Sequence, residues 1–212
     1  QKTAYEIMPS LVGSEMCIRD SDTAAMMITN PSTLGIFEPE IAEAAEIVHK
    51  AGGQMYYDGA NFNAILGKTN PGLMGFDAVH YNLHKTFSQP HGGGGPGSGP
   101  IGVKDHLSEF LPSPLASRRE SREGDPTGAG DGFHYFWQDV GDNSIGKVQQ
   151  WNGNAGAVVR AWAFYRRYGR DLERMSEHAV LNSNYLRHKI MNPEPDVAAK
   201  INCMPSEGSE AS

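Results

Sequence analysis

A strand, a helix and a second strand follow one another with short connections between residues 24 and 58, and this order constrains the fold most. Residues 24–29, AAMMIT, form a short apolar run that is typical of a buried strand. Residues 38–53 predict a helix, and residues 54–58, QMYYD, predict the next strand. A strand–helix–strand unit places its two strands in parallel. We therefore expect an α/β protein with a largely parallel sheet.

The helix predicted at 38–53 contains its own start and stop signals. Pro39 lies near the first turn, where the missing N–H is tolerated, and Gly52 and Gly53 end the helix. The apolar positions recur at helical spacing and form one stripe. These positions are Ile41, Ala44, Ala45 and Val48.

A third strand is predicted at 76–83, FDAVHYNL, and a lysine follows it. Asp58 ends the second strand, and Lys85 comes just after the third. Ligands of parallel sheets bind beyond the carboxyl ends of the strands. We therefore expect Asp58 and Lys85 to meet in one crevice.

Asp58 and Lys85 together match the chemical needs of pyridoxal phosphate. A desolvated lysine is a nucleophile for Schiff-base chemistry, and a carboxylate keeps the pyridine nitrogen protonated. Gly59 and Ala60 are small and would let a flat ring approach the backbone. Two ordinary interpretations stay open: a lysine that reaches solvent at a strand end, and an aspartate that forms a turn before glycine.

Seven of the eleven residues from 92 to 102 are glycine. Their N–H groups suit a phosphate cradle or a close-packed loop, whereas a flexible linker is the alternative. Pro90, Pro96 and Pro100 stiffen the segment and favour the packed loop.

Polar residues flank the lysine on both sides. Strand alternation predicts that His80 and His84 share a face with Asn82. His80, His84 and His91 suit metal binding, acid–base chemistry or polar packing, but no thiolate or carboxylate cluster supports a metal. Thr86 either donates to a phosphate or caps a turn.

Past residue 110 the character of the sequence changes. Residues 110–132 read as a long, turn-rich connection, and two amphipathic helices are predicted at 150–168 and 170–190, joined at Gly169. The aromatic residues between the connection and the helices are expected to be core rather than site. They are Phe133, Tyr135, Phe136 and Trp137.

The organisation we expect has five parts. Residues 1–21 resemble translated sequencing-adapter read-through, so we interpret them as non-native. Next come a partial cofactor-binding large domain at 22–110, a connecting segment at 111–149 and a helical region at 150–190. Residues 191–212 read as an unstructured tail.

Composition excludes several functional classes. The net charge is −7 with no run of Lys or Arg, which argues against nucleic-acid binding. No apolar segment approaches the roughly 20 residues of a membrane span. The two cysteines, Cys17 and Cys203, show no metal spacing, and we expect a reducing cytoplasm.

Several segments resemble glycine decarboxylase, the P-protein of the glycine cleavage system, in its pyridoxal-phosphate-bearing half. The resemblance rests on DGANFNAI, on GFDAVHYNLHKTFSQPHGGGGPGSGPIGV, and on TNPSTLGIFE at 29–38. SIGKVQQWNGNAGAVVRAWAFY and SEHAVLNSNYL are similar to later helices of the family. The resemblance implies a type I aminotransferase-like fold, followed by a helical start of the small domain.

The resemblance also implies roles for individual residues. Lys85 would form the Schiff base with pyridoxal 5'-phosphate, Asp58 would pair with its ring nitrogen, and Ala60 would lie against the ring. His84 and Thr86 would complete the cofactor site. The remaining residues are expected in the substrate pocket or its loops. They are Asn30, Thr33, His80, His91, Gly92 and Gly93.

The family reaction is an oxidoreduction that decarboxylates glycine and passes the aminomethyl group to the lipoyl arm of the H-protein. The implied partners are glycine, lipoylated H-protein and the other half of the P-protein, in a heterotetramer or a fused homodimer. The cytoplasm is the implied compartment in bacteria, and the mitochondrion in eukaryotes.

The family's upstream phosphate-binding helix start and ring-stacking histidine have no counterpart here, so we expect a fragment whose own activity is in doubt. Three other interpretations stay open: another type I decarboxylase or desulfurase, a non-catalytic scaffold half, and a nucleotide-binding α/β module.

Overall fold

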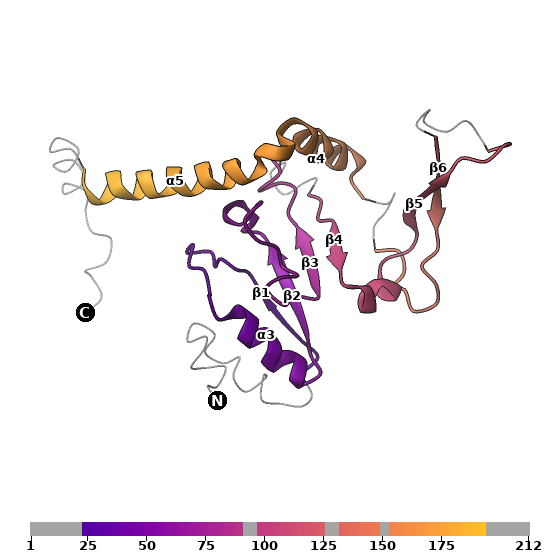
Figure 1. Ribbon diagram of the computed structural model, residues 1–212, viewed down its shortest axis with the longest axis horizontal. Helices are drawn as coiled ribbons and strands as arrows, with labels where there is room; N and C mark the ends of the chain where they lie inside the picture. The colour runs from indigo at the N-terminus through magenta and orange to yellow at the C-terminus, as the bar shows by residue number, and fades with distance from the viewer. Residues whose placement is uncertain (1–22, 91–96, 126–131, 149–152, 194–212) are drawn as a thin grey trace, which may run out of the picture.

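A four-stranded sheet forms the centre of the computed structural model, which describes residues 23–90, 97–125, 132–148 and 153–193 (Figure 1). Its strands, in spatial order, are β1 (Ala25–Ile28), β2 (Gln54–Gly59), β3 (Ala78–Tyr81) and β4 (Ile101–Val103). The first three are parallel, and β4 runs antiparallel to β3. The expected α/β class with a largely parallel sheet is confirmed.

Helix α3 (Ile41–Lys50) covers one face of this sheet (Figure 1). Its buried residues are Ile41, Ala44, Ala45 and Val48, which is the predicted stripe. They share one core with Met55 and Tyr57 of β2, both fully buried. Burying a side chain the size of Ile, Val or Met stabilises the fold by about 1.5–3 kcal/mol. The packing of α3 against β2 therefore holds the strand–helix–strand unit together.

The opposite face of the sheet is much more open. Alternation along β2 buries Met55 and Tyr57 and leaves Tyr56 and Asp58 only half-buried. The parallel register sets Met27 beside Tyr56, and Met27 is 59% exposed. Side chains on this face are therefore accessible to a ligand.

Strand β3 is shorter than the prediction of 76–83, because it ends at Tyr81. The chain then turns through residues 83–87, where the Lys85 N–H donates to the Asn82 carbonyl at 3.1 Å. Strand alternation therefore does not extend to His84, because a turn has no period of two. Asn82 does share the side of His80, since its Nδ2 lies 3.2 Å from Nε2 of His80.

A two-stranded hairpin replaces most of the connection expected at 110–132 and lies within the segment 111–149. Strands β5 (Leu115–Glu120) and β6 (Phe133–Gln138) pair antiparallel, away from the main sheet (Figure 1). The prediction that the β6 aromatic residues are core is wrong for Tyr135, Phe136 and Trp137, which are 51%, 37% and 59% exposed. A hairpin that no layer covers cannot bury both of its faces.

The two predicted C-terminal helices are present. Helix α4 (Ala155–Tyr168) begins after Asn154, whose side chain accepts a hydrogen bond from the Ala157 N–H at 3.2 Å. Helix α5 (Leu172–Met191) follows a short 3-10 turn that starts at Gly169. Figure 1 shows α5 extending away from the rest of the molecule. In the described residues no helix is long and apolar enough to cross a membrane.

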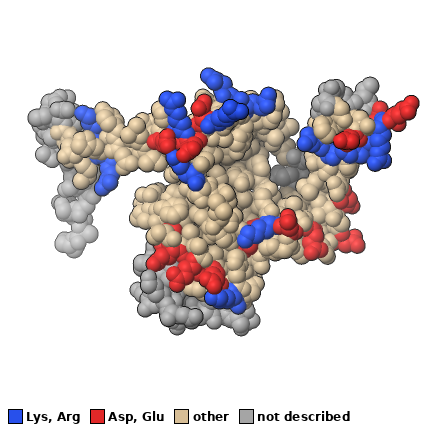
Figure 2. Space-filling model, in the orientation of Figure 1, with Lys and Arg blue, Asp and Glu red and all other residues tan. Residues whose placement is uncertain are grey.

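The charged side chains are divided among elements. Figure 2 shows acidic side chains gathered over α3 and basic side chains over α4. Glu43 and Glu46 belong to the first group, and Arg166 and Arg167 to the second. Helix α4 therefore gives a positive character to the end of the molecule toward which β2 and β3 point (Figure 1).

Candidate active site

The parallel register brings Asp58 and His80 side by side at the carboxyl ends of β2 and β3. The Nε2 of His80 lies 3.2 Å from Oδ1 of Asp58, within ion-pair distance. The same Oδ1 accepts a hydrogen bond from the Ala60 N–H at 2.9 Å. Oδ2 accepts no hydrogen bond from any described residue, which leaves one carboxylate oxygen of Asp58 for a ligand.

A tyrosine and an asparagine hold the His80 ring. Its Nδ1 lies 3.0 Å from the Tyr56 hydroxyl, and its Nε2 lies 3.2 Å from Nδ2 of Asn82. Burial raises the pKa of Tyr56, and the nearby Asp58 charge raises it further, so this hydroxyl keeps its proton. The open face thus carries a polar row that runs from Tyr56 through His80 to Asp58.

Asp58 also lines a hollow of about 630 Å³. The other wall is the loop after β1, including Asn30, Thr33 and Leu34. The sequence-predicted residues Asp58, Asn30 and Thr33 are therefore brought together, although they are up to 28 positions apart in the chain.

Asn30 and Thr33 differ in their contacts. Asn30 is buried and pins the loop, because its Oδ1 accepts from the Glu38 N–H at 2.8 Å and its Nδ2 donates to the Glu38 carbonyl at 3.1 Å. Its own carbonyl accepts a 2.6 Å hydrogen bond from the buried Tyr57 hydroxyl. Asn30 is thus a structural residue of the wall, whereas Thr33 is exposed and open to a ligand.

Gly59 ends β2, Ala60 follows it, and the two residues make different contacts. A Cβ at Gly59 would lie 1.8 Å from the His80 carbonyl oxygen, so the contact between strands requires glycine there. Ala60 is half-buried and contributes its N–H to Asp58.

Lys85 is exposed, and its turn is anchored by the neighbouring residues. Among the described residues its Nζ makes no hydrogen bond and no ion pair. Phe87 is fully buried and lies 6.0 Å from Phe164 and 5.1 Å from Tyr165 of α4, measured between ring centroids. The expectation of a desolvated lysine is wrong for this chain, because only the residues beside Lys85 enter the core.

Thr86 and His84 lie on either side of the lysine. Thr86 is 8% exposed, and its hydroxyl has no partner among the described residues. His84 is half-buried. The other predicted residues of this segment, His91, Gly92 and Gly93, lie outside the described residues.

No family model matches the chain, but several curated proteins of one name are similar to it. It is 55% identical over 170 residues to "Probable glycine dehydrogenase (decarboxylating) subunit 2" of Listeria monocytogenes serotype 4b (strain F2365). It is 57% identical over 169 residues to the protein of the same name from Thermococcus onnurineus (strain NA1). These matches cover 80% and 79% of this chain and 32% of each relative.

This chain belongs to the glycine dehydrogenase (decarboxylating) subunit 2 family. It spans about a third of the length of the curated relatives that it matches.

A solved structure supports the fold of this subunit 2 family member. Mouse CSAD in its apo form is 20% identical to the chain, with a TM-score of 0.52, over 89% of this chain and 36% of that one. The likeness confirms the expected fold, the type I aminotransferase-like α/β large domain in part, followed by helices.

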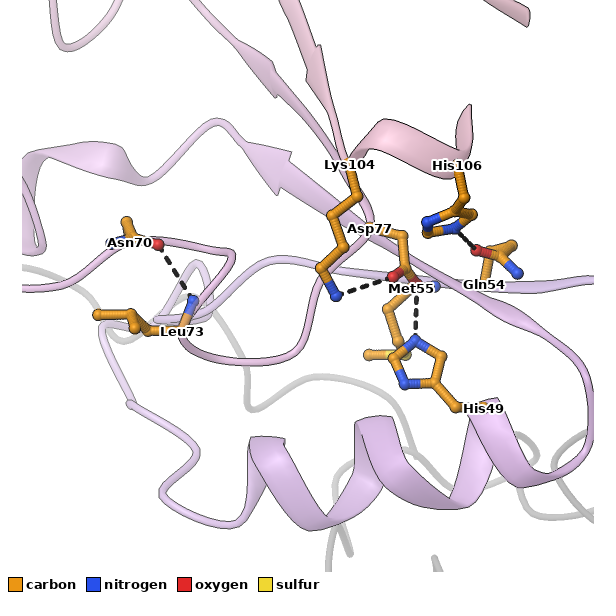
Figure 3. Close-up of polar contacts among 8 residues, drawn as sticks. All are labelled: His49, Gln54, Met55, Asn70, Leu73, Asp77, Lys104 and His106. Atoms are coloured by element: carbon orange, nitrogen blue, oxygen red, sulfur yellow. Dashed lines mark hydrogen bonds and ion pairs between the residues drawn. The ribbon is translucent and has the colours of Figure 1, made fainter. Parts of the chain in front are cut away.

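A second polar cluster in this subunit 2 chain was missed by the sequence reasoning (Figure 3). Asp77 precedes β3, and its side chain is 3% exposed. Its Oδ2 lies 2.6 Å from His49 Nε2 and accepts from the Met55 N–H at 2.7 Å, while Lys104 donates to Oδ1 at 3.0 Å. Nearby, His106 contacts Gln54 at 2.8 Å.

The Asp77 cluster lies at the amino ends of the parallel strands, at the opposite edge from Asp58. Burial by itself raises the pKa of Asp77, but hydrogen bonds from Met55, His49 and Lys104 outweigh it and hold that pKa below its usual value. Since these three donors come from α3, β2 and the residue after β4, the cluster ties the layers together. The only signal in the sequence was an aspartate beside an apolar strand.

Proposed function

We propose that this chain forms the part of a glycine decarboxylase that holds pyridoxal 5'-phosphate, with Lys85 and Asp58 as its two main ligands. The observation that carries the proposal is the Asp58 carboxylate, which lines a hollow at the end of β2 and whose Oδ2 accepts no hydrogen bond from any described residue. Strand β2 pairs with β3, the strand that leads to Lys85. Family membership supports the substrate, since the relatives are named for the decarboxylation of glycine.

The described residues fit this cofactor in three respects. Asp58 offers a carboxylate oxygen without a partner, and Lys85 offers an unpaired amine. The Thr86 hydroxyl is buried without a partner among the described residues, which suits a donor to a phosphate oxygen. When bound, the cofactor supplies an electron sink for the pair released as carbon dioxide leaves glycine.

The residues of the chain would bind, orient and shield. Lys85 would hold the aldehyde carbon of the cofactor until glycine takes its place, and then retain or return the proton on Nζ. Asp58 would keep the ring nitrogen protonated through Oδ2. Asn30 would keep the loop 31–38 in place as a wall that limits the access of water.

The partners that we propose follow from the name of the relatives. Subunit 2 implies a second P-protein subunit. We propose that the aminomethyl group passes to a lipoylated H-protein, as the family resemblance implies.

Covalent trapping tests the cofactor assignment in the full chain. With one equivalent of pyridoxal 5'-phosphate followed by borohydride, we expect a single reduced adduct on the peptide that contains Lys85. Lys85→Ala should abolish this adduct. Lys50→Ala is the matched control, because Lys50 is exposed on α3 and pairs only with Glu46.

Equal labelling of several lysines, or an adduct that survives Lys85→Ala, would contradict the assignment. The substrate is tested separately in the complete enzyme with its partner subunit. We expect exchange of the glycine carboxyl carbon with bicarbonate that depends on H-protein, and exchange with another amino acid instead would contradict glycine as the substrate.

A further inference from the structure

The two carboxylate oxygens of Asp58 have different contacts, and the proposed cofactor role of Asp58 does not explain this difference. Two groups hold one oxygen of Asp58, namely the Ala60 N–H and the His80 ring, and none of the described residues holds the other. The Ala60 contact spans two residues and is the one that an aspartate makes when it forms a turn before glycine. The His80 contact instead reaches across to the neighbouring strand, and a turn alone does not require it.

The contacts of His80 favour one tautomer. A bare Nε2 would set its lone pair near the negative Oδ1 of Asp58, 3.2 Å away, whereas a proton on Nε2 is attracted to that oxygen. With the proton on Nε2, Nδ1 accepts from the Tyr56 hydroxyl at 3.0 Å. The Asn82 side chain, at 3.2 Å from Nε2, would then present its amide oxygen, since the two ends of an amide are interchangeable in shape.

The Tyr56 side chain and partial burial also hold the His80 ring in place. Burial keeps the Tyr56 hydroxyl protonated and therefore able to donate. The rings of Tyr56 and His80 lie 5.6 Å apart between centroids, so packing as well as hydrogen bonding fixes the imidazole. The side chains of His80 and Asp58 are 23% and 31% exposed, which leaves their contact partly shielded from water.

We propose that His80, oriented by Tyr56, is a positioning residue for Asp58. It holds Oδ1 in place, so that Oδ2 stays directed to the ring nitrogen of the cofactor. The proposal rests on the proposed function, since it assigns Asp58 to that nitrogen. It adds the half-buried Tyr56 and a fixed tautomer of His80 to the site.

The first test needs no cofactor. In the full chain labelled with ¹⁵N-histidine, long-range ¹⁵N–¹H spectra report which ring nitrogen of His80 carries the proton. We expect Nε2–H in the wild-type chain, and a mixture of tautomers in Tyr56→Phe. Tyr81→Phe is the matched control, because it removes a hydroxyl from the covered side of the same sheet. A proton on Nδ1 in the wild-type chain would overturn the proposal.

The second test measures the dissociation constant and visible spectrum of added pyridoxal 5'-phosphate. We expect His80→Leu to weaken binding about tenfold, the worth of one charge-assisted contact. His80→Gln keeps a neutral donor and should stay within about threefold of the wild-type value. His106→Leu, at the opposite edge, should change nothing, and melting curves check that each variant is folded.

A double-variant cycle separates this proposal from the proposed function. If Asp58→Asn weakens binding and adding His80→Leu weakens it no further, His80 acts through Asp58. If the two losses simply add, or if His80→Gln binds as poorly as His80→Leu, the positioning role is wrong. If Asp58→Asn has no effect, the cofactor pairing itself is wrong, and the tautomer measurement alone decides whether His80 is fixed by Asp58.

Discussion

At the scale of single residues, two aspartates show how neighbouring contacts set the role of a side chain. Asp58 is half-buried, and none of the described residues donates a hydrogen bond to its Oδ2. Both oxygens of Asp77 have partners, and its side chain is almost fully buried. A free oxygen on an accessible face suits a ligand. A fully paired and buried carboxylate suits stability, because losing its partners leaves a charge without compensation.

Asp77 makes stability depend on pH in a predictable direction. Its folded-state pKa lies below the unfolded value, so its contribution is complete above about pH 4 and declines as the pH falls toward the folded-state pKa. We expect Asp77→Asn to lower the free energy of unfolding by about 2 kcal/mol near pH 7. The gap should shrink toward about pH 3. Urea unfolding at both pH values measures it.

The control for Asp77 is Asp105→Asn, which changes the exposed carboxyl of the residue that directly follows Lys104. It should leave stability nearly unchanged at either pH. A difference between Asp77→Asn and the wild type that stays constant with pH would mean that packing, rather than ionisation, accounts for the loss.

At the scale of elements, α4 supports the turn that presents Lys85. The turn has no regular hydrogen-bond ladder, so its position depends on Phe87, which packs against Phe164 and Tyr165. Helix α4, although far from Lys85 in the sequence, thus fixes the position of the turn that carries Lys85.

Two aromatic residues of α4 should differ sharply when truncated. Phe164 is 9% exposed and faces Phe87, so Phe164→Ala should cost about 3 kcal/mol of stability through lost burial and a cavity. Trp162, on the same helix and 63% exposed, is the matched control, and Trp162→Ala should cost less than about 0.5 kcal/mol. Chemical denaturation gives both values, and equal losses would contradict this packing.

At the scale of the whole molecule, compactness decreases from the sheet to the C-terminal end. The core joins β1, β2, β3 and α3 and reaches α4 through Phe164. Helix α5 buries only Ser176, and Lys68 contacts Glu173 and Glu177 near its start. Side chains between Ala179 and Arg187 line a hollow of about 650 Å³ together with the loop after β1, and the C-terminal end of α5 extends away from the body (Figure 1).

Hydrogen exchange should reveal this gradient. Local opening is easiest where few apolar contacts are broken, so amides at 178–191 should exchange at least about tenfold faster than those of α3. Mass spectrometry of peptic peptides from the full chain measures both regions. Slow exchange at 178–191 would show that this half of α5 is covered by contacts that the structure lacks, for example with a second copy.

Local sequence patterns were enough to predict the strand–helix–strand unit, the apolar stripe of α3 and the break between α4 and α5. These features follow from periodicity and from glycine, which act over a few neighbouring residues. The sequence also indicated that Asp58 and Lys85 lie at one edge of the sheet, because the carboxyl ends of parallel strands meet at the same edge.

The contacts between distant segments became visible only in the folded chain. The pairing of β5 with β6, the partners of Asp77 and the row from Tyr56 to Asp58 join residues whose separation along the chain carries no signal. The expected burial of Lys85 and of the β6 aromatic residues was wrong for the same physical reason. Burial depends on which layer packs over a side chain, and a local pattern of residues does not contain that information.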